Sequence, residues 1–232
     1  MKTLLFTCFA ALLSTCAIAD SRAAVRAATS GEAALHDGEY AKAVEWFNKA
    51  IQEDDTNPSF YGNRGSAYSY LGKLDEALRD YDTAIQKATA LTGNPKDKRI
   101  AYFLYNRAFA YENAGRTLEA LAEYAKTIEL DPSYPDAHGN VAWILATHPD
   151  KAIRNSQKAL EYALIEVKRT RMEIAGPLDT LAAAYAAEGR FTDACRAQKL
   201  AIAKALLPQD KREFSERLQI YEQNKPYIAP AK

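Results

Sequence analysis

The chain has 232 residues, and its 30 Lys and Arg residues balance 30 Asp and Glu residues, so its formal net charge at pH 7 is zero. Such a balance lacks the excess of positive charge by which proteins bind nucleic acids or anionic membrane surfaces. We therefore expect no nucleic-acid partner.

The first 19 residues have the pattern of an export signal. Lys2 supplies a positive start, residues 4–13 form an apolar run, and Ala17-Ile18-Ala19 gives a small-x-small cleavage site before Asp20. The apolar run is too short to remain in a bilayer as a spanning helix. The sequence predicts a chain without a membrane span, exported to the periplasm of a Gram-negative bacterium.

A lipoprotein signal is the alternative for this segment. Leu13-Ser14-Thr15 precedes Cys16, which would then accept the lipid, although Thr15 is an unusual residue at that place. The mature chain accordingly begins at Asp20 or at a lipidated Cys16, and we favour the first. Cys195 is the single cysteine after residue 19, so that part of the chain can form no internal disulfide.

Six residues recur 34 positions later with the same or a similar type. The pairs are Gly31 and Gly65, Gly38 and Gly72, Ala43 and Ala77, Phe47 and Tyr81, Ala50 and Ala84, and Ile51 and Ile85. An internal period of this length determines the architecture, because each repeat is one supersecondary unit that packs on its neighbours. The period and residue types resemble the tetratricopeptide repeat, a helix-turn-helix unit that usually binds other proteins.

The first two predicted repeats cover residues 24–57 and 58–91, with bounds that are approximate. In the first, an alanine-rich helix is followed by the turn Asp37-Gly38-Glu39, and Tyr40 opens a second helix. The second repeat has its turn at residues 71–73. A nine-residue insertion follows, and its Gly93-Asn94-Pro95 sequence is typical of a surface loop.

Three further repeats are predicted at about 101–134, 135–170 and 175–208. The fourth departs from the pattern, because Pro149 removes the residue before it from helical geometry and ends the leading helix near His148. Its second helix restarts near Asn155 or Ser156, either of which could cap it. Residues 142–147 and 178–185 resemble an exported bacterial variant of the repeat.

A last helix at about 209–224 has Phe214, Leu218 and Tyr221 on one side, as a terminal cap of a repeat stack requires. Residues 225–232 contain Pro226 and Pro230, and we expect them to form a flexible tail. The resemblance implies an all-α, right-handed superhelical solenoid of about five repeats plus this C-terminal capping helix. The repeat domain covers residues 20–224.

The leading helices of stacked helix pairs line a concave groove in which a partner would bind. By the resemblance, Asn63, Asn106 and Asn140 occupy equivalent places there, and an amide both donates and accepts hydrogen bonds to the main chain of an extended peptide. Aromatic side chains would add apolar contact area. The predicted groove residues are Asn63, Tyr70, Tyr102, Tyr105, Asn106, Phe109, Asn140 and Trp143. The alternative is that each asparagine bonds within or between helices and each aromatic side chain belongs to the core.

Chaperone-adaptor members of this family hold a terminal carboxylate with a clamp of Lys and Arg side chains. The matching places here carry Ala28, Glu32, Asn63, Tyr102 and Asn106, of which Asn63 alone fits. The resemblance therefore predicts no such clamp, and no acidic C-terminal tail as the ligand.

No catalytic pattern stands out. His36, His138 and His148 have no partner at metal-ligand spacing, and there is no phosphate-binding glycine loop or nucleophile elbow. We expect a non-catalytic protein–protein interaction module without cofactor or metal, which binds a partner protein or extended peptide in its groove. Two alternatives stay open: a self-associating structural scaffold of an envelope complex, or a lipid-anchored accessory factor.

Overall fold

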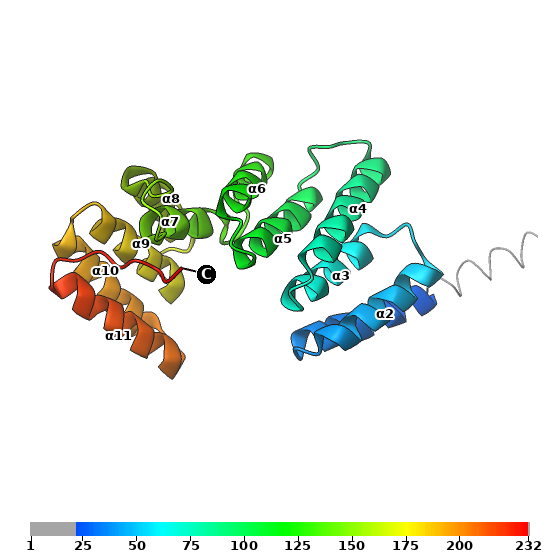
Figure 1. Ribbon diagram of the computed structural model, residues 1–232, viewed down its shortest axis with the longest axis horizontal. Helices are drawn as coiled ribbons and strands as arrows, with labels where there is room; N and C mark the ends of the chain where they lie inside the picture. Colours follow the sequence, from blue (N-terminus) through cyan, green and yellow to red (C-terminus); the bar gives the residue numbers. More distant parts are fainter. Residues whose placement is uncertain (1–21, 232) are drawn as a thin grey trace, which may run out of the picture. The chain divides into compact units, whose positions relative to one another are not determined.

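The computed structural model describes residues 22–231, and the regular structure in this range is α-helical throughout, without a strand (Figure 1). The expectation of an all-α fold is confirmed. The predicted export signal over residues 1–19, including Cys16, lies outside the described residues and stays a prediction.

The described chain forms two compact units within the range that the sequence analysis treats as one repeat domain. We call the part up to Glu123 unit 1 and the part from Tyr124 unit 2. Unit 1 contains a helix over residues 22–36, α2 (Tyr40–Glu53), α3 (Pro58–Tyr70), α4 (Leu74–Thr92), α5 (Arg99–Asn113) and the start of α6 (Thr117–Leu130). Unit 2 contains the rest of α6, α7 (Ala137–Thr147), α8 (Ser156–Arg169), α9 (Ala175–Ala187), α10 (Phe191–Lys204) and α11 (Pro208–Glu222).

Within each unit the helices pack on their neighbours in the sequence. In unit 1, α3 contacts α2, α4 and α5, and in unit 2, α9 contacts α7, α8 and α10, while α11 packs on α10. The first inward alanine of each second helix is 0% exposed, and these residues are Ala43, Ala77, Ala120, Ala159 and Ala194. A side chain of one methyl group allows the helix axes to approach closely, so the small residues of the period are what lets the hairpins stack.

The turn between the two helices of a hairpin recurs with the same geometry. Gly38, Gly72, Gly115 and Gly189 have φ between 72° and 76°, which favours glycine. After Gly72, the Lys73 N–H donates to the Tyr68 carbonyl at 2.9 Å, which satisfies a carbonyl at the helix end. The fourth hairpin lacks this glycine. There α7 ends before Pro149, and the Asn155 side chain caps α8 by accepting from the Lys158 N–H at 3.0 Å.

An arginine ties the helices of unit 1 together. Both Nε and Nη2 of Arg64 donate to the Asp80 carboxylate at 2.7 Å, and its Nη1 donates to Asn48 at 2.7 Å, so one side chain joins α2, α3 and α4. The next hairpin repeats the arrangement with Arg107 and Glu123. The Arg64 pair uses both oxygens of the Asp80 carboxylate, whereas Nε and Nη2 of Arg107 both donate to Oε2 of Glu123. Each pair sets the position of a leading helix against its partner.

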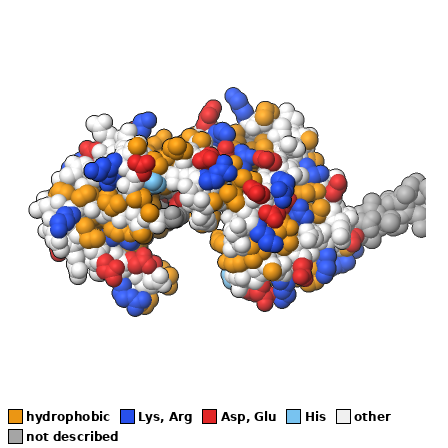
Figure 2. Space-filling view, viewed as in Figure 1, with side chains coloured by type: hydrophobic (Ala, Val, Ile, Leu, Met, Phe, Trp, Pro, Cys, Tyr) orange, Lys and Arg blue, Asp and Glu red, His pale blue; other side chains and the backbone are white. Residues whose placement is uncertain are grey.

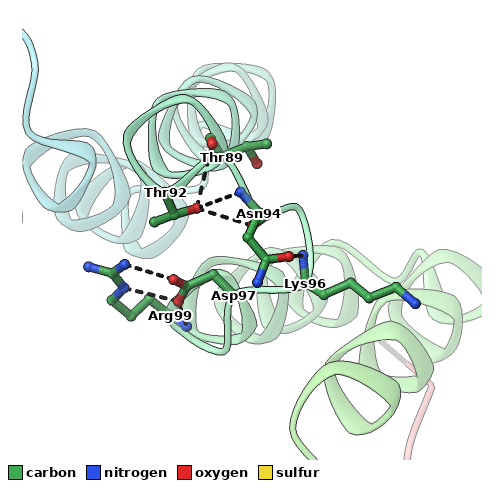
Figure 3. Close-up of polar contacts among 6 residues, drawn as sticks. All are labelled: Thr89, Thr92, Asn94, Lys96, Asp97 and Arg99. Carbon is green, nitrogen blue, oxygen red and sulfur yellow. Dashed lines mark hydrogen bonds and ion pairs between the residues drawn. The ribbon is translucent and has the colours of Figure 1, made fainter.

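The insertion between the second and third repeats is divided between a longer helix and a tight loop (Figure 3). The helix α4 has 19 residues against 14 in α2, so part of the insertion continues the helix. In the loop, the Lys96 N–H donates to Asn94 Oδ1 at 2.9 Å, and Asp97 accepts from the main chain and the guanidinium of Arg99 at 2.9 and 2.7 Å. These bonds set the start of α5.

The Asp97 contacts lead to a pH-dependent prediction. Hydrogen bonds from Arg99 lower the pKa of the Asp97 carboxyl to about 2. A lowered folded-state pKa means that the loop contact is complete above the ordinary value near 3.8 and is lost as the pH falls through about 2. An NMR titration of the Asp97 carboxyl should find this midpoint, and Arg99→Ala should raise it toward the ordinary value.

Lys96→Ala serves as the control, because Lys96 bonds within the loop through its main chain. In this variant the titration midpoint of Asp97 should stay as low as in the unaltered chain. A midpoint near the ordinary value in the unaltered chain would contradict the loop contacts.

Candidate binding site

Unit 1 contains a cavity of about 420 Å³ on the side of its leading helices. Three successive leading helices contribute to its wall, namely the helix over residues 22–36, α3 and α5. The residues that line it are Leu35, His36, Tyr40, Ser66, Ser69, Tyr70, Tyr81, Tyr102, Asn106 and Phe109. We call this cavity the unit-1 pocket. Four of the predicted groove residues, Tyr70, Tyr102, Asn106 and Phe109, meet here.

Aromatic rings form one wall of the unit-1 pocket. Tyr70 ends α3 and Tyr40 begins α2, and their rings stack with centroids 4.6 Å apart and planes at 9°. Phe109 of α5 lies 6.4 Å from Tyr70 in a tilted arrangement. Tyr70 remains 54% exposed, so an aromatic surface held in a fixed orientation faces the solvent. Such rings offer a large contact area at little cost in conformational entropy.

The floor of the unit-1 pocket is polar but uncharged. Tyr81 is buried, and its hydroxyl lies 3.2 Å from Ser66 Oγ. Burial raises the pKa of the Tyr81 hydroxyl well above its ordinary range, so it stays protonated. The lining includes no Asp, Glu, Lys or Arg, although such side chains are spread over the face that Figure 2 shows. The imidazole of His36, which does line the pocket, lies 3.1 Å from the carboxylate of Asp37, which does not. A charged ligand group would lose its hydration there without gaining an opposite charge, so the pocket favours a neutral ligand.

The three predicted asparagines each donate a hydrogen bond within the chain. Nδ2 of Asn63 donates to Glu32 at 3.2 Å, and its Oδ1 accepts from the Tyr102 hydroxyl at 3.0 Å. Asn106 donates to the Tyr102 carbonyl at 2.7 Å, and Asn140 to the Tyr124 hydroxyl at 3.1 Å. These contacts agree with the alternative in which the amides hold helices. Asn106 differs from the other two, since it also lines the unit-1 pocket.

Two predicted residues are placed differently from the others. Tyr105 is half-buried and is not among the residues that line the unit-1 pocket. Trp143 in unit 2 is half-buried, and its ring lies 5.8 Å from that of Tyr227. The segment after α11, which we expected to be flexible, therefore covers part of α7. Trp143 does not face an open groove because the chain itself occupies that place.

Across residues 22–231, no three His, Cys, Asp or Glu side chains gather where they could hold a metal ion. In the same range no helix is both long and apolar enough to cross a membrane. Cys195 is half-buried, and burial raises the pKa of its thiol, which disfavours the reactive thiolate.

Comparison with known families identifies the repeats. Family models described as tetratricopeptide repeat match residues 30–58, 58–88 and 101–134. Residues 30–88 and 101–134 of the chain are tetratricopeptide repeats. Proteins with these repeats are generally non-enzymatic modules that bind other proteins.

Curated relatives match the tetratricopeptide repeats over part of the chain. "Small glutamine-rich tetratricopeptide repeat-containing protein 2" of Mycosarcoma maydis is 29% identical over 103 residues, which are 44% of this chain and 27% of that protein. "Hsp70-Hsp90 organizing protein" of Triticum aestivum is 28% identical over 125 residues, or 45% of this chain and 22% of that protein. The matched region thus spans about a quarter of the length of these relatives.

A solved structure extends the likeness to nearly the whole chain. Pseudomonas aeruginosa pilF matches with a TM-score of 0.69 and 16% identity, over 89% of this chain and 87% of that one. At this identity the similarity shows the fold alone. It confirms the tetratricopeptide solenoid as the fold class.

The carboxylate clamp of chaperone adaptors is not formed in unit 1. Tyr102 stands where the clamp has a cation, and its hydroxyl donates to Asn63, which in turn donates to Glu32. A carboxylate placed there would meet Glu32 rather than a positive charge. These positions therefore lack the positive charges with which the clamp pairs a carboxylate.

Sequence reasoning missed the part of the unit-1 pocket that the first repeat contributes. Leu35, His36 and Tyr40 flank the first glycine turn and reach the pocket because the end of α3 packs beside that turn. An aromatic residue at the first position of the helix after a glycine turn is the signal that could have indicated Tyr40, which the structure half buries. The stack with Tyr70 could not be foreseen, since it joins two hairpins.

Proposed function

We propose that the chain is a non-catalytic interaction module and that its unit-1 pocket binds an extended segment of a partner protein. The observation that carries the proposal is the pocket itself: a neutral cavity of about 420 Å³ between three leading helices, with the exposed ring of Tyr70 at its edge. Pockets that bury an aromatic or aliphatic anchor side chain supply most of the affinity in protein interfaces.

The lining indicates which ligand chemistry fits. The rings of Tyr40, Tyr70 and Phe109 would contact an apolar side chain such as proline, leucine or an aromatic residue. Ser69 and Asn106 supply groups that donate to and accept from a peptide main chain. Because the pocket lacks cations, the ligand is an internal, uncharged stretch of the partner rather than an acidic terminus.

The relatives support a protein partner as the ligand class. One of them carries the name "Hsp70-Hsp90 organizing protein", which describes a protein that works on other proteins. This chain lacks the clamp cations, so we do not extend the chaperone partners of that relative to it. If residues 1–19 direct export, as we propose, the partner meets this chain in the periplasm.

A peptide-display selection against residues 20–232 tests the proposal. Selected peptides, remade and measured by calorimetry, should be uncharged at their anchor and should bind Tyr70→Ala at least tenfold more weakly, a loss of about 1.4 kcal/mol. Phe109→Ala should weaken binding similarly, since it removes the neighbouring ring.

The matched control is Leu118→Ala. Leu118 is 67% exposed on α6 and does not line the unit-1 pocket, so its loss should leave peptide affinity unchanged. Peptides whose affinity is indifferent to Tyr70 and Phe109 would overturn the proposal. Binding of a second copy of the chain in place of any peptide would favour the self-associating scaffold instead.

A further inference from the structure

After α11 the chain continues without regular structure to its C-terminal end (red in Figure 1), and Tyr227 and Ala229 contact α7. Tyr227 and Ala229 are half-buried, while Pro226, Ile228 and Pro230 are exposed. This alternation has the period of two that an extended chain shows when one side contacts a surface. Residues 225–231, which we call the C-terminal strap, therefore have one side directed at unit 2 and one at solvent.

A main-chain hydrogen bond fixes the register of the C-terminal strap. The Ala229 N–H donates to the carbonyl oxygen of Thr147 at 2.8 Å. Thr147 is the last residue of α7, and the last four carbonyls of a helix have no partner within it. The strap thus satisfies an acceptor that α7 leaves available, as any extended peptide could do.

An aromatic side chain anchors the C-terminal strap. The Tyr227 ring lies 5.8 Å from the Trp143 ring, and the Arg217 guanidinium lies 5.4 Å from Trp143 and 5.5 Å from Tyr227. Arg217 is held independently of the strap, because its Nε donates to the buried Asp179 carboxylate at 2.8 Å. The anchor site for Tyr227 is consequently built by α7, α9 and α11, and it does not depend on the strap.

Trp143 and Thr147 both lie on α7, and the strap contacts each of them through a different residue, Tyr227 and Ala229. We infer that the surface formed by Trp143, Thr147 and Arg217 is a peptide-binding site that holds the C-terminal strap in cis. The same site accepts in trans an extended segment with an aromatic side chain two residues before a small one. A partner segment of that chemistry competes with the strap for the site.

The attachment of the C-terminal strap is of the strength that permits exchange. It rests on the Tyr227 ring, which lies against Trp143 and Arg217, and on two main-chain hydrogen bonds, from the Lys225 N–H to the Ile220 carbonyl at 3.2 Å and from the Ala229 N–H to Thr147. Pro226 and Pro230 restrict the chain to extended conformations before it binds. A short tether gives a bound segment an effective concentration of the order of mM. A trans peptide must overcome that concentration in the full chain but not in a chain without the strap.

A trans-binding experiment tests this inference. The probe is a fluorescein-labelled peptide of residues 225–231, and its anisotropy is followed with residues 20–224 and with residues 20–232. The shorter chain should bind the peptide saturably, and the longer chain at least tenfold more weakly. A longer chain carrying Tyr227→Ala should recover part of the binding, which keeps the test valid should the shorter chain fail to fold.

Two peptide variants serve as matched controls. Tyr227→Ala in the peptide should abolish binding, whereas Ile228→Ala should retain it, because Ile228 is exposed in the strap. A shorter chain that is folded by circular dichroism yet fails to bind the peptide at mM concentration would overturn the inference. Equal affinity of the shorter and longer chains would do so too, since the strap would then leave the site open. Neither result bears on the unit-1 pocket, which lies in the other unit.

Discussion

Gly62→Ala is expected to destabilise unit 1 by about 2 kcal/mol, although alanine is the better helix former. A methyl group at Gly62 of α3 would lie 2.4 Å from Cε1 and 2.6 Å from Cδ1 of Phe103 in α5. Phe103 is only 4% exposed and cannot turn into solvent. Adding a methyl group to such a tightly packed contact lowers the free energy of unfolding by up to about 3 kcal/mol. The higher helix propensity of alanine offsets up to about 1 kcal/mol of this loss.

Urea unfolding followed by circular dichroism measures this effect, and hydrogen exchange in α3 and α5 localises it. Gly176→Ala is the matched control, because Gly176 is helical and no atom lies within 4 Å of the added methyl. That variant should be as stable as the parent chain or more stable by up to about 1 kcal/mol. Equal stability of Gly62→Ala and the parent would show that α3 and α5 do not approach as closely as described.

Gly62 also shows where reading the sequence succeeds and where it fails. The helices and glycine turns could be predicted, because a turn such as Gly72 and an inward alanine such as Ala77 are local features that recur with the period. Gly62 stands directly before the predicted groove residue Asn63, and the structure buries it against Phe103 of the next hairpin. Which ring of the next hairpin fills a space is a non-local fact that the period does not contain.

In the candidate sites, too, some residues could be predicted from local sequence features and some contacts could not. Tyr70, Asn106 and Phe109 could be assigned to the pocket because they lie on the ligand-facing side of leading helices. Two ring contacts could not be predicted, since each joins segments far apart in the sequence. They are the stack of Tyr40 on Tyr70 and the contact of Tyr227 with Trp143. A proline-containing terminal segment is expected to be flexible when the surface that it packs against is not known from the sequence.

The last hairpin breaks the repeat pattern in its core. Where earlier second helices bury Phe47, Tyr81 and Tyr124, α10 buries Gln198, which is 0% exposed. Nε2 of Gln198 donates to Asp179 Oδ1 at 2.7 Å and to the Phe214 carbonyl at 3.0 Å. The single amide group of Gln198 therefore joins α10 to both α9 and the capping helix α11 through hydrogen bonds.

Arg217→Met should destabilise unit 2 by about 3–5 kcal/mol at pH 7, because it leaves a buried carboxylate without its cation. Asp179 is 5% exposed, and among the described residues 22–231 Arg217 is the one cation that pairs with it. Methionine keeps much of the packing volume, so the loss reports mainly on charge. The double variant with Asp179→Asn should recover a large part of the stability, since it removes the unpaired charge as well.

The loss in Arg217→Met should also depend on pH, and the sign follows from the buried acid. Burial raises the pKa of Asp179, while Arg217 opposes the shift, so the variant has a still higher folded-state pKa. Folding then favours the protonated acid, and the deficit shrinks as the pH falls toward the ordinary carboxyl value near 3.9. Urea unfolding at pH 7 and pH 5 measures the change.

The control is Lys199→Ala, which removes an exposed ion pair with Glu222. It should lower the free energy of unfolding by about 0.5 kcal/mol or less at both pH values. A deficit for Arg217→Met that is small, or that grows on acidification, would refute a buried charge pair as the link between α9 and α11.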